Sequence, residues 1–133
     1  MKRAVVVWII AISCMPLLHA ENWQEIVDSL QRRLSLEQTD SGKIVLNLKL
    51  SDALIGNHPD KAFEYAKEAK RIAQEAGDTT YLIRSILKQC DFYSQIGEHN
   101  TAIELAYEAL NIAGNNYHLL SLCHNRIAFA IIG

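Results

Sequence analysis

The stretch PDKAFEYAKEAKRIA, Pro59–Ala73, and the similar stretch HNTAIELAYEALNIA, His99–Ala113, decide the fold of this chain. Self-similarity at a period of about 33–40 residues is typical of helical repeat proteins. Alanines at i, i+4 and i+7 lie on one helical face, which another helix can approach closely, and the glutamates lie on a different, solvated face. At an offset of forty positions the identical pairs are Ala62/Ala102, Glu64/Glu104, Ala66/Ala106, Glu68/Glu108, Ala69/Ala109, Ile72/Ile112 and Ala73/Ala113.

The first twenty residues, MKRAVVVWIIAISCMPLLHA, have the layout of a secretory signal peptide. Two basic residues precede an apolar run, Ala4–Ile12, that is shorter than the roughly 20 residues a membrane span needs. We therefore expect cleavage after Ala20 and export to a periplasmic or other extracytoplasmic compartment. A membrane anchor and a buried first helix are the alternatives, and Cys14 is a candidate for lipid attachment.

The composition is that of a globular, mildly acidic protein, with 50% hydrophobic residues, 21% charged residues and a net charge of −2. Removal of residues 1–20 takes away two positive charges and leaves 11 positive against 15 negative, a net charge of −4. No nucleic acid partner is expected, because phosphates demand a basic face. Cys90 and Cys123 fall within helical apolar patterns and are expected to be small buried hydrophobes. A disulfide between them is the alternative in an oxidising compartment.

The chain after residue 20 predicts helices joined by short turns. Glu21–Leu36 is amphipathic and has no counterpart at the repeat period, so we expect a lead-in helix that caps the first repeat. A polar loop is expected over 37–42. The segment 43–55 alternates in part as a strand would, but the repeat favours a helix there. Further helices are expected over 59 to about 76, 81–96, 99 or 100 to 113, and 117–132.

No catalytic arrangement stands out. The serines do not form a G-x-S-x-G motif, and the chain has no glycine-rich phosphate loop and no H-E-x-x-H motif. His58 and His99 fall in equivalent turns, which successive repeats hold about 10 Å apart. His118, Cys123 and His124 do not share one helical face. We therefore expect no enzymatic activity, no cofactor and no metal.

The order of small, aromatic and glycine residues over roughly 43–133 resembles the tetratricopeptide repeat, in which two antiparallel helices recur about every 34 residues. The resemblance implies an all-α, right-handed α-α superhelix of about two and a half helical-hairpin repeats behind the lead-in helix. The repeats would span about 43–78, 81–115 and an incomplete 117–133. The matching positions are Leu50, Ala53, Asn57, Ala62, Ala66 and Ala69, then Cys90, Tyr93, Gly97, Ala102, Ala106 and Ala109, then Leu119 and Ala128.

The signal-like start, the lead-in helix and the segment NHPDKAFEYAKEAKRIAQEAGD resemble the exported N-terminal tetratricopeptide regions of bacterial sensor and regulatory proteins. This resemblance implies a non-enzymatic protein–protein interaction module, the sensory input part of a signal-transduction protein. A membrane-tethered or secreted scaffold or assembly factor is the alternative. The sequence ends within a first helix of a repeat, so we expect a longer product, or a last helix covered by a partner or by a second copy in a homodimer. Membrane contact would come only through the signal or a downstream segment.

In tetratricopeptide arrays the first helices of the repeats line a concave groove that holds a peptide or another helix. The family's carboxylate clamp needs lysine and asparagine at positions that here carry Leu87 and Asp91, so recognition of chaperone tails is not expected. The alignment with the family gives seven exposed first-helix positions as candidate contacts with a protein or peptide partner: Asn47, Ser51, Arg84, Lys88, Asp91, Asn125 and Arg126.

Overall fold

The computed structural model describes residues 22–132, which form six helices and no strand. The predicted all-α class is confirmed, and the strand alternative for 43–55 is wrong. The predicted signal peptide, residues 1–20, lies outside the described residues. The first helix covers 22–36, and the others are α2 (Asp40–Leu54), α3 (Pro59–Ala76), α4 (Thr79–Gln95), α5 (His99–Ala113) and α6 (Tyr117–Ile132).

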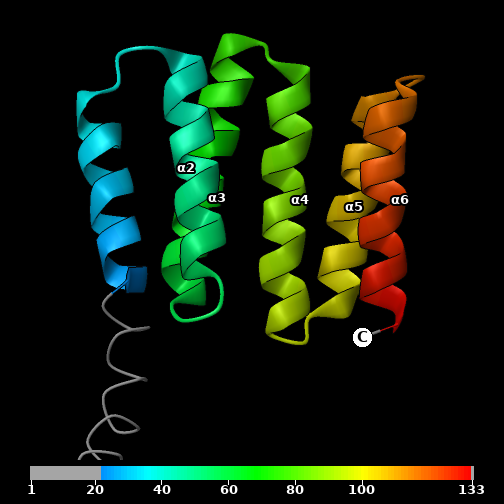
Figure 1. Cartoon of the computed structure of the whole chain (residues 1–133). Helices are drawn as coiled ribbons and strands as arrows, with labels where there is room; N and C mark the ends of the chain where they lie inside the picture. The colour runs from blue at the N-terminus through cyan, green and yellow to red at the C-terminus, as the bar shows by residue number, and fades with distance from the viewer. Residues whose placement is uncertain (1–21, 133) are drawn as a thin grey trace, which may run out of the picture.

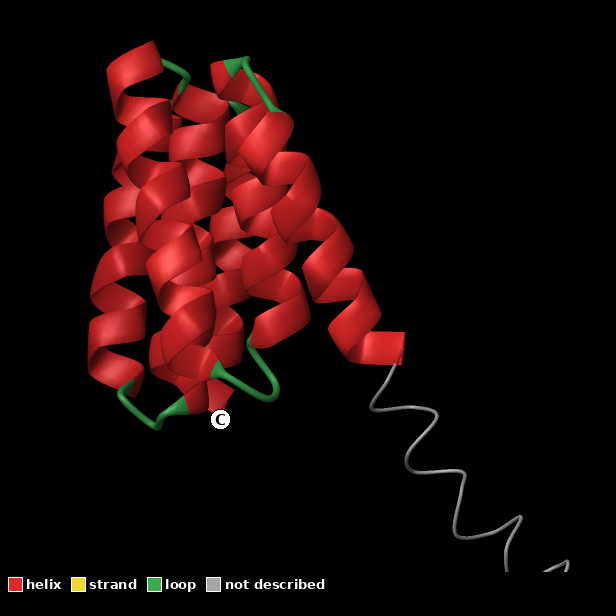
Figure 2. Ribbon diagram, turned by 90° about the vertical axis from the view of Figure 1, so that its left-hand side faces the viewer, coloured by secondary structure: helices red, strands yellow, loops and turns green. Residues whose placement is uncertain are grey.

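The helices stand side by side in two rows (Figure 1). From α2 onward each helix packs against the next one in the chain, and α2, α4 and α6 also contact one another in series. Short loops connect the helices at the two ends of the molecule (Figure 2). We refer to α2, α4 and α6 as the front row and to α3 and α5 as the back row. The first helix stands at one end of the molecule, and α6 stands at the other.

The back row buries alanine. Because alanine has no side chain beyond Cβ, the front helices can approach α3 and α5 closely. On the opposite face of this row, Lys70 of α3 pairs with Glu108 of α5 at 3.3 Å. The predicted alanine packing face is therefore confirmed. Six alanines have an exposed fraction of 0%, namely Ala62, Ala66, Ala69, Ala102, Ala106 and Ala109.

The loop before α2 is shorter than predicted, because α2 begins at Asp40 and not after residue 42. The Thr39 hydroxyl oxygen accepts a hydrogen bond from the Gly42 N–H at 3.1 Å and so caps the helix. The Glu37 carboxylate in turn accepts from the Thr39 N–H at 2.9 Å and from its hydroxyl at 2.8 Å. These bonds to Thr39 lower the pKa of Glu37. They also explain why 40–42 are helical.

The turn between α3 and α4 ends α3 at the predicted residue, Ala76, and begins α4 at Thr79, two residues before the predicted start. Gly77 ends α3 in a left-handed conformation, with φ of 68°, and the Asp78 N–H donates to the Ala73 carbonyl at 2.9 Å. The Asp78 carboxylate then accepts from the Tyr81 N–H at 3.0 Å and caps α4. Local side-chain chemistry therefore sets both helix ends.

The first helix covers the beginning of the row. Trp23 Nε1 donates to the carbonyl of Ala53 on α2 at 2.6 Å. Val27 and Leu30 are buried in one cluster with α2 residues and with Ala62 of α3. The predicted lead-in helix is consistent with this packing.

Candidate partner-binding groove

A cavity of about 580 Å³ opens over the front row, and we refer to it as the front groove. Its apolar lining includes one leucine from each front helix, Leu48, Leu87 and Leu122. These leucines are buried or half-buried, so the floor of the groove is apolar. The other lining residues are Val45, Lys49 and Asp52 from α2, Tyr81, Arg84 and Lys88 from α4, and His118 and Arg126 from α6.

Two equivalent ion pairs connect the front helices. Lys88 of α4 binds Asp52 of α2, and Arg126 of α6 binds Asp91 of α4 with Nε 2.8 Å from Oδ1. The two aspartates are 39 residues apart and the two cations are 38 apart, so they hold the same positions on successive front helices. Lys49 holds this cation position on α2. Lys88 and Arg126 each pair with an aspartate of the preceding front-row helix. No front-row helix precedes α2, so Lys49 has no equivalent partner within the described residues.

Asp91 is more enclosed than Asp52, with a side chain 26% exposed against 55%. Burial raises the pKa of the Asp91 carboxyl above its ordinary value, and the charges of Arg126 and Lys88 act in the opposite direction. The Lys88 Nζ lies 3.6 Å from Asp91 Oδ2. Because desolvation offsets much of the attraction in an enclosed ion pair, the net contribution of the Asp91–Arg126 pair to stability is small.

Two cations in the front groove have no acidic partner among residues 22–132. Lys49 and Arg84 are exposed, and the Arg84 guanidinium lies 5.9 Å from the centroid of the Tyr81 ring. The lining contains four cations and one acid, Asp52, although the whole chain has a net charge of −2. A cleft with one sign of charge and apolar walls concentrates the field of its charges. The front groove therefore favours an anionic group.

Four of the seven predicted contact residues lie at this site. Arg84, Lys88 and Arg126 line the front groove. Asp91 lines an adjoining cavity of about 620 Å³ near the end of α4, together with Arg126. Asn125 is exposed on α6 but does not line either cavity.

The predicted exposure of Asn47 and Ser51 is wrong, because these residues are only 3% and 2% exposed. The Asn47 Nδ2 donates to the Lys43 carbonyl within α2 at 2.8 Å. The equivalent positions of the front-row ion pairs are 38 or 39 residues apart, whereas the matching alanines of the back row are 40 apart. Lys49 and Asp52, which are not among the predicted contact residues, line the groove instead. Their K-x-x-D pattern recurs at 88–91 and is the sequence signal for them.

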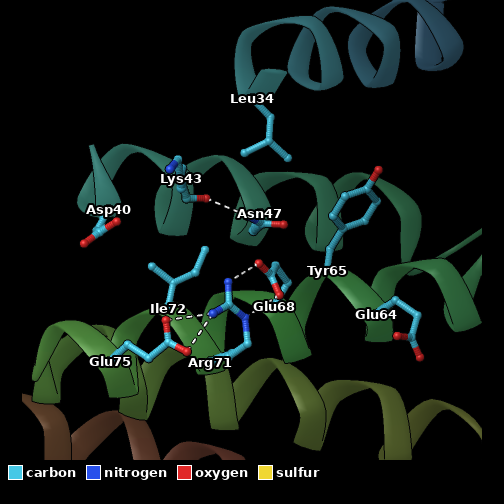
Figure 3. Close-up of a pocket in the computed structure, with 10 residues that line it drawn as sticks. All are labelled: Leu34, Asp40, Lys43, Asn47, Glu64, Tyr65, Glu68, Arg71, Ile72 and Glu75. Atoms are coloured by element: carbon cyan, nitrogen blue, oxygen red, sulfur yellow. Dashed lines mark hydrogen bonds and ion pairs between the residues drawn. The ribbon is translucent and has the colours of Figure 1, made fainter. Parts of the chain in front are cut away.

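A third cavity, of about 650 Å³, lies between the first helix, α2 and α3 (Figure 3). Arg71 points into this cavity but already forms ion pairs, because its guanidinium lies 2.7 Å from the carboxylates of both Glu68 and Glu75. The hydrogen bond from Arg71 lowers the pKa of Glu68. Asp40 and Glu64 also line the cavity, and acids outnumber cations there. Its charge is thus opposite to that of the front groove.

Cys90 and Cys123 are free and buried in one cluster of α4, α5 and α6 residues. Their predicted role as small buried hydrophobes is confirmed, and they form no disulfide. Burial raises the pKa of the Cys90 thiol to about 12, so the reactive thiolate is scarce at neutral pH. Among residues 22–132, no three histidine, cysteine, aspartate or glutamate side chains come together as metal ligands would.

No family model matches the chain, and no curated protein or solved structure matches it. No helix within 22–132 is both long enough and apolar enough to cross a membrane. The tetratricopeptide resemblance, the export and the lack of enzymatic activity therefore stay predictions.

Proposed function

We propose that this chain is an exported, non-enzymatic interaction module that binds a protein or peptide partner in the front groove. Its fold would be a right-handed, tetratricopeptide-like superhelix. The antiparallel pairs α2–α3 and α4–α5, and the contacts of α2, α4 and α6 in series, support this assignment. The signal-like residues 1–20 support export to the periplasm. A role as the input part of a bacterial signal-transduction protein rests on the sequence resemblance.

The observation that carries this proposal is the charge of the front groove. Lys49 and Arg84 are exposed cations above an apolar floor, and the ion pairs hold Lys88 and Arg126 in place around them. An arginine or lysine beside a groove binds a carboxylate without a further change in the protein. The partner would therefore be an acidic peptide or helix with apolar side chains that fit the leucine floor.

Binding of labelled synthetic peptides would test this function. An Asp/Glu-rich peptide with interspersed leucines, a Lys/Arg-rich peptide and an uncharged peptide of equal length would each be titrated by fluorescence anisotropy. We expect the acidic peptide to bind most tightly. We expect the double variant Lys49→Glu, Arg84→Glu to weaken its binding at least about tenfold, which corresponds to about 1.4 kcal/mol. Helicity should not change, because both residues are exposed.

The matched control is the double variant Arg33→Glu, Lys61→Glu. It changes the net charge by the same amount at exposed positions on the first helix and α3, outside the front groove. We expect it to change the affinity by less than about twofold, because charges beyond the Debye length of about 8–10 Å are screened. Equal weakening by both double variants would show a response to net charge alone. That result, or preference for the basic peptide, would contradict the proposal.

A further inference from the structure

The last helix carries the largest exposed apolar surface among residues 22–132. Tyr117, Phe129, Ile131 and Ile132 are 86%, 65%, 66% and 85% exposed. At the opposite end of the row, the first helix covers α2. Within the described residues, the row is therefore covered at one end and open at the other, where α6 stands (Figure 1).

The exposed face of α6 has an internal symmetry. The helical period places Tyr117, Ser121, Ala128 and Ile132 on one face, with His124 and Asn125 between them, and all six residues are exposed. Large side chains thus lie at both ends of the face and small ones lie nearer its middle. The opposite face of α6 is buried against the other helices through Leu119, Cys123, Ile127 and Ala130.

We propose that this face binds a second copy of the chain, with the two α6 helices antiparallel about a two-fold axis that passes between His124 and Asn125. Tyr117 of each copy then faces Ile132 of the other, and Ser121 faces Ala128. The small residues Ser121 and Ala128 lie one turn to either side of the axis and limit the separation of the two helices less than Tyr117 and Ile132, which fill the space at the ends.

The middle of the face fits the same register. His124 of each copy faces Asn125 of the other, and an imidazole and an amide can each donate and accept a hydrogen bond. Arg126 is the only charged residue of α6, and it is engaged by Asp91 within the same copy. The two-fold axis therefore does not bring unpaired like charges together.

The exposed area also suits a dimer. Tyr117 and Ile132 lie on the face, and Phe129 and Ile131 flank it at its two edges. The four exposed fractions together correspond to about three fully exposed large side chains. At roughly 150–200 Å² for each such side chain, two copies bury roughly 900–1,200 Å² from these residues alone. Stable interfaces bury about 1,200–2,000 Å² in total. Together with the smaller residues of the face, the patch reaches the lower end of that range.

Sedimentation equilibrium of the purified protein over a range of concentrations tests the proposal. We expect a reversible monomer–dimer equilibrium. Ala128→Arg places a large cation in the middle of the face and should raise the dissociation constant of the dimer at least about tenfold. Gln74→Arg, which adds the same group at an exposed position on α3, is the matched control and should change it by less than about twofold. Circular dichroism should show equal helicity for all three proteins.

A complementation experiment tests the register itself. Ser121→Glu should also weaken self-association, because the new carboxylate faces an apolar methyl group. When this variant is mixed with Ala128→Arg, the new carboxylate faces the new guanidinium, and a heterodimer should form more tightly than either homodimer.

The proposal is wrong if the unmodified protein sediments as a monomer at every concentration, or if Ala128→Arg and Gln74→Arg behave alike. Failure of the two variants to form a heterodimer would exclude this antiparallel register. The groove variant Lys49→Glu, Arg84→Glu should dimerise like the unmodified protein, because neither residue lies on α6. Loss of dimerisation in that variant would place the interface at the front groove and would also contradict the proposal.

Discussion

The back row and the front row contain helices of similar length, yet they bury different side chains. The helices α3 and α5 bury alanines almost exclusively, and their charged residues pair mostly within one helix, as in Arg71 with Glu68 and Glu75. The helices α2, α4 and α6 bury mainly large residues, and their charged residues pair mostly between helices. The back row therefore sets how closely the helices pack, and the front row presents the surface that a partner can bind.

The largest effect should come from breaking the alanine face of the back row. Ala106→Leu adds a large side chain at a position that is 0% exposed in the middle of α5. Overpacking of this kind costs about 1–3 kcal/mol of the free energy of unfolding. Tyr107→Leu, at the next position and 51% exposed, is the control and should cost less than about 0.5 kcal/mol. Urea unfolding followed by circular dichroism would measure both, and equal midpoints would refute the close packing of α5.

Removal of the acids of the front row should have a smaller effect that differs between the two ion pairs. Asp91→Ala leaves the partly enclosed Arg126 without its partner and should cost about 1–2 kcal/mol. Asp52→Ala removes the more exposed acid and should cost about 0–1 kcal/mol. The same unfolding experiment would compare them. A larger loss for Asp52→Ala would show that the ion pair between α2 and α4 contributes more to stability than the ion pair between α4 and α6.

The pH dependence of stability should also report on Asp91. Since burial raises its pKa in the folded state, Asp91 contributes stability that is fully present below its unfolded value of about 3.9 and is lost as the pH rises through the folded value. Asp91→Asn lacks this titration. As the pH rises, the unmodified protein loses the contribution of Asp91 and the variant does not. We therefore expect the free energy of unfolding of the variant to fall less, or to rise more, over this pH range. Parallel profiles between pH 3 and pH 7 would contradict the raised pKa.

The smallest effect should come from the exposed ion pairs of the back row. The side chains of Arg71 and its two glutamate partners are all about half exposed or more, so Arg71→Ala should cost only about 0.2–1 kcal/mol. The cost should decrease further in high salt, because exposed charges are screened. Urea unfolding at low and high salt would measure it. A loss as large as that of Ala106→Leu would overturn the distinction between packing and charge in this row.

The helix ends could be predicted from the sequence because their determinants act within one turn. Gly77 and Asp78 are examples, since a left-handed glycine and a capping carboxylate need only their neighbours in the chain. The exposed face of α2 could not be predicted in the same way. This helix buries residues on several sides, among them Leu46, Asn47 and Leu48, so its pattern does not single out one polar face. The pattern of α2 therefore predicts Asn47 and Ser51 as groove residues, although Lys49 and Asp52 line the groove.

The sequence by itself determined that the chain is helical, where most helices begin and end, and which face of the back row is packed. These properties follow from local hydrogen bonding and from the spacing of alanine along single helices. Only the tertiary structure decided which charges meet, as in Lys88 with Asp52 and Arg126 with Asp91, 36 and 35 residues apart. It also decided that one face of α6 is exposed within residues 22–132. Contacts between helices depend on their relative stagger, and that stagger results from the packing of the whole row.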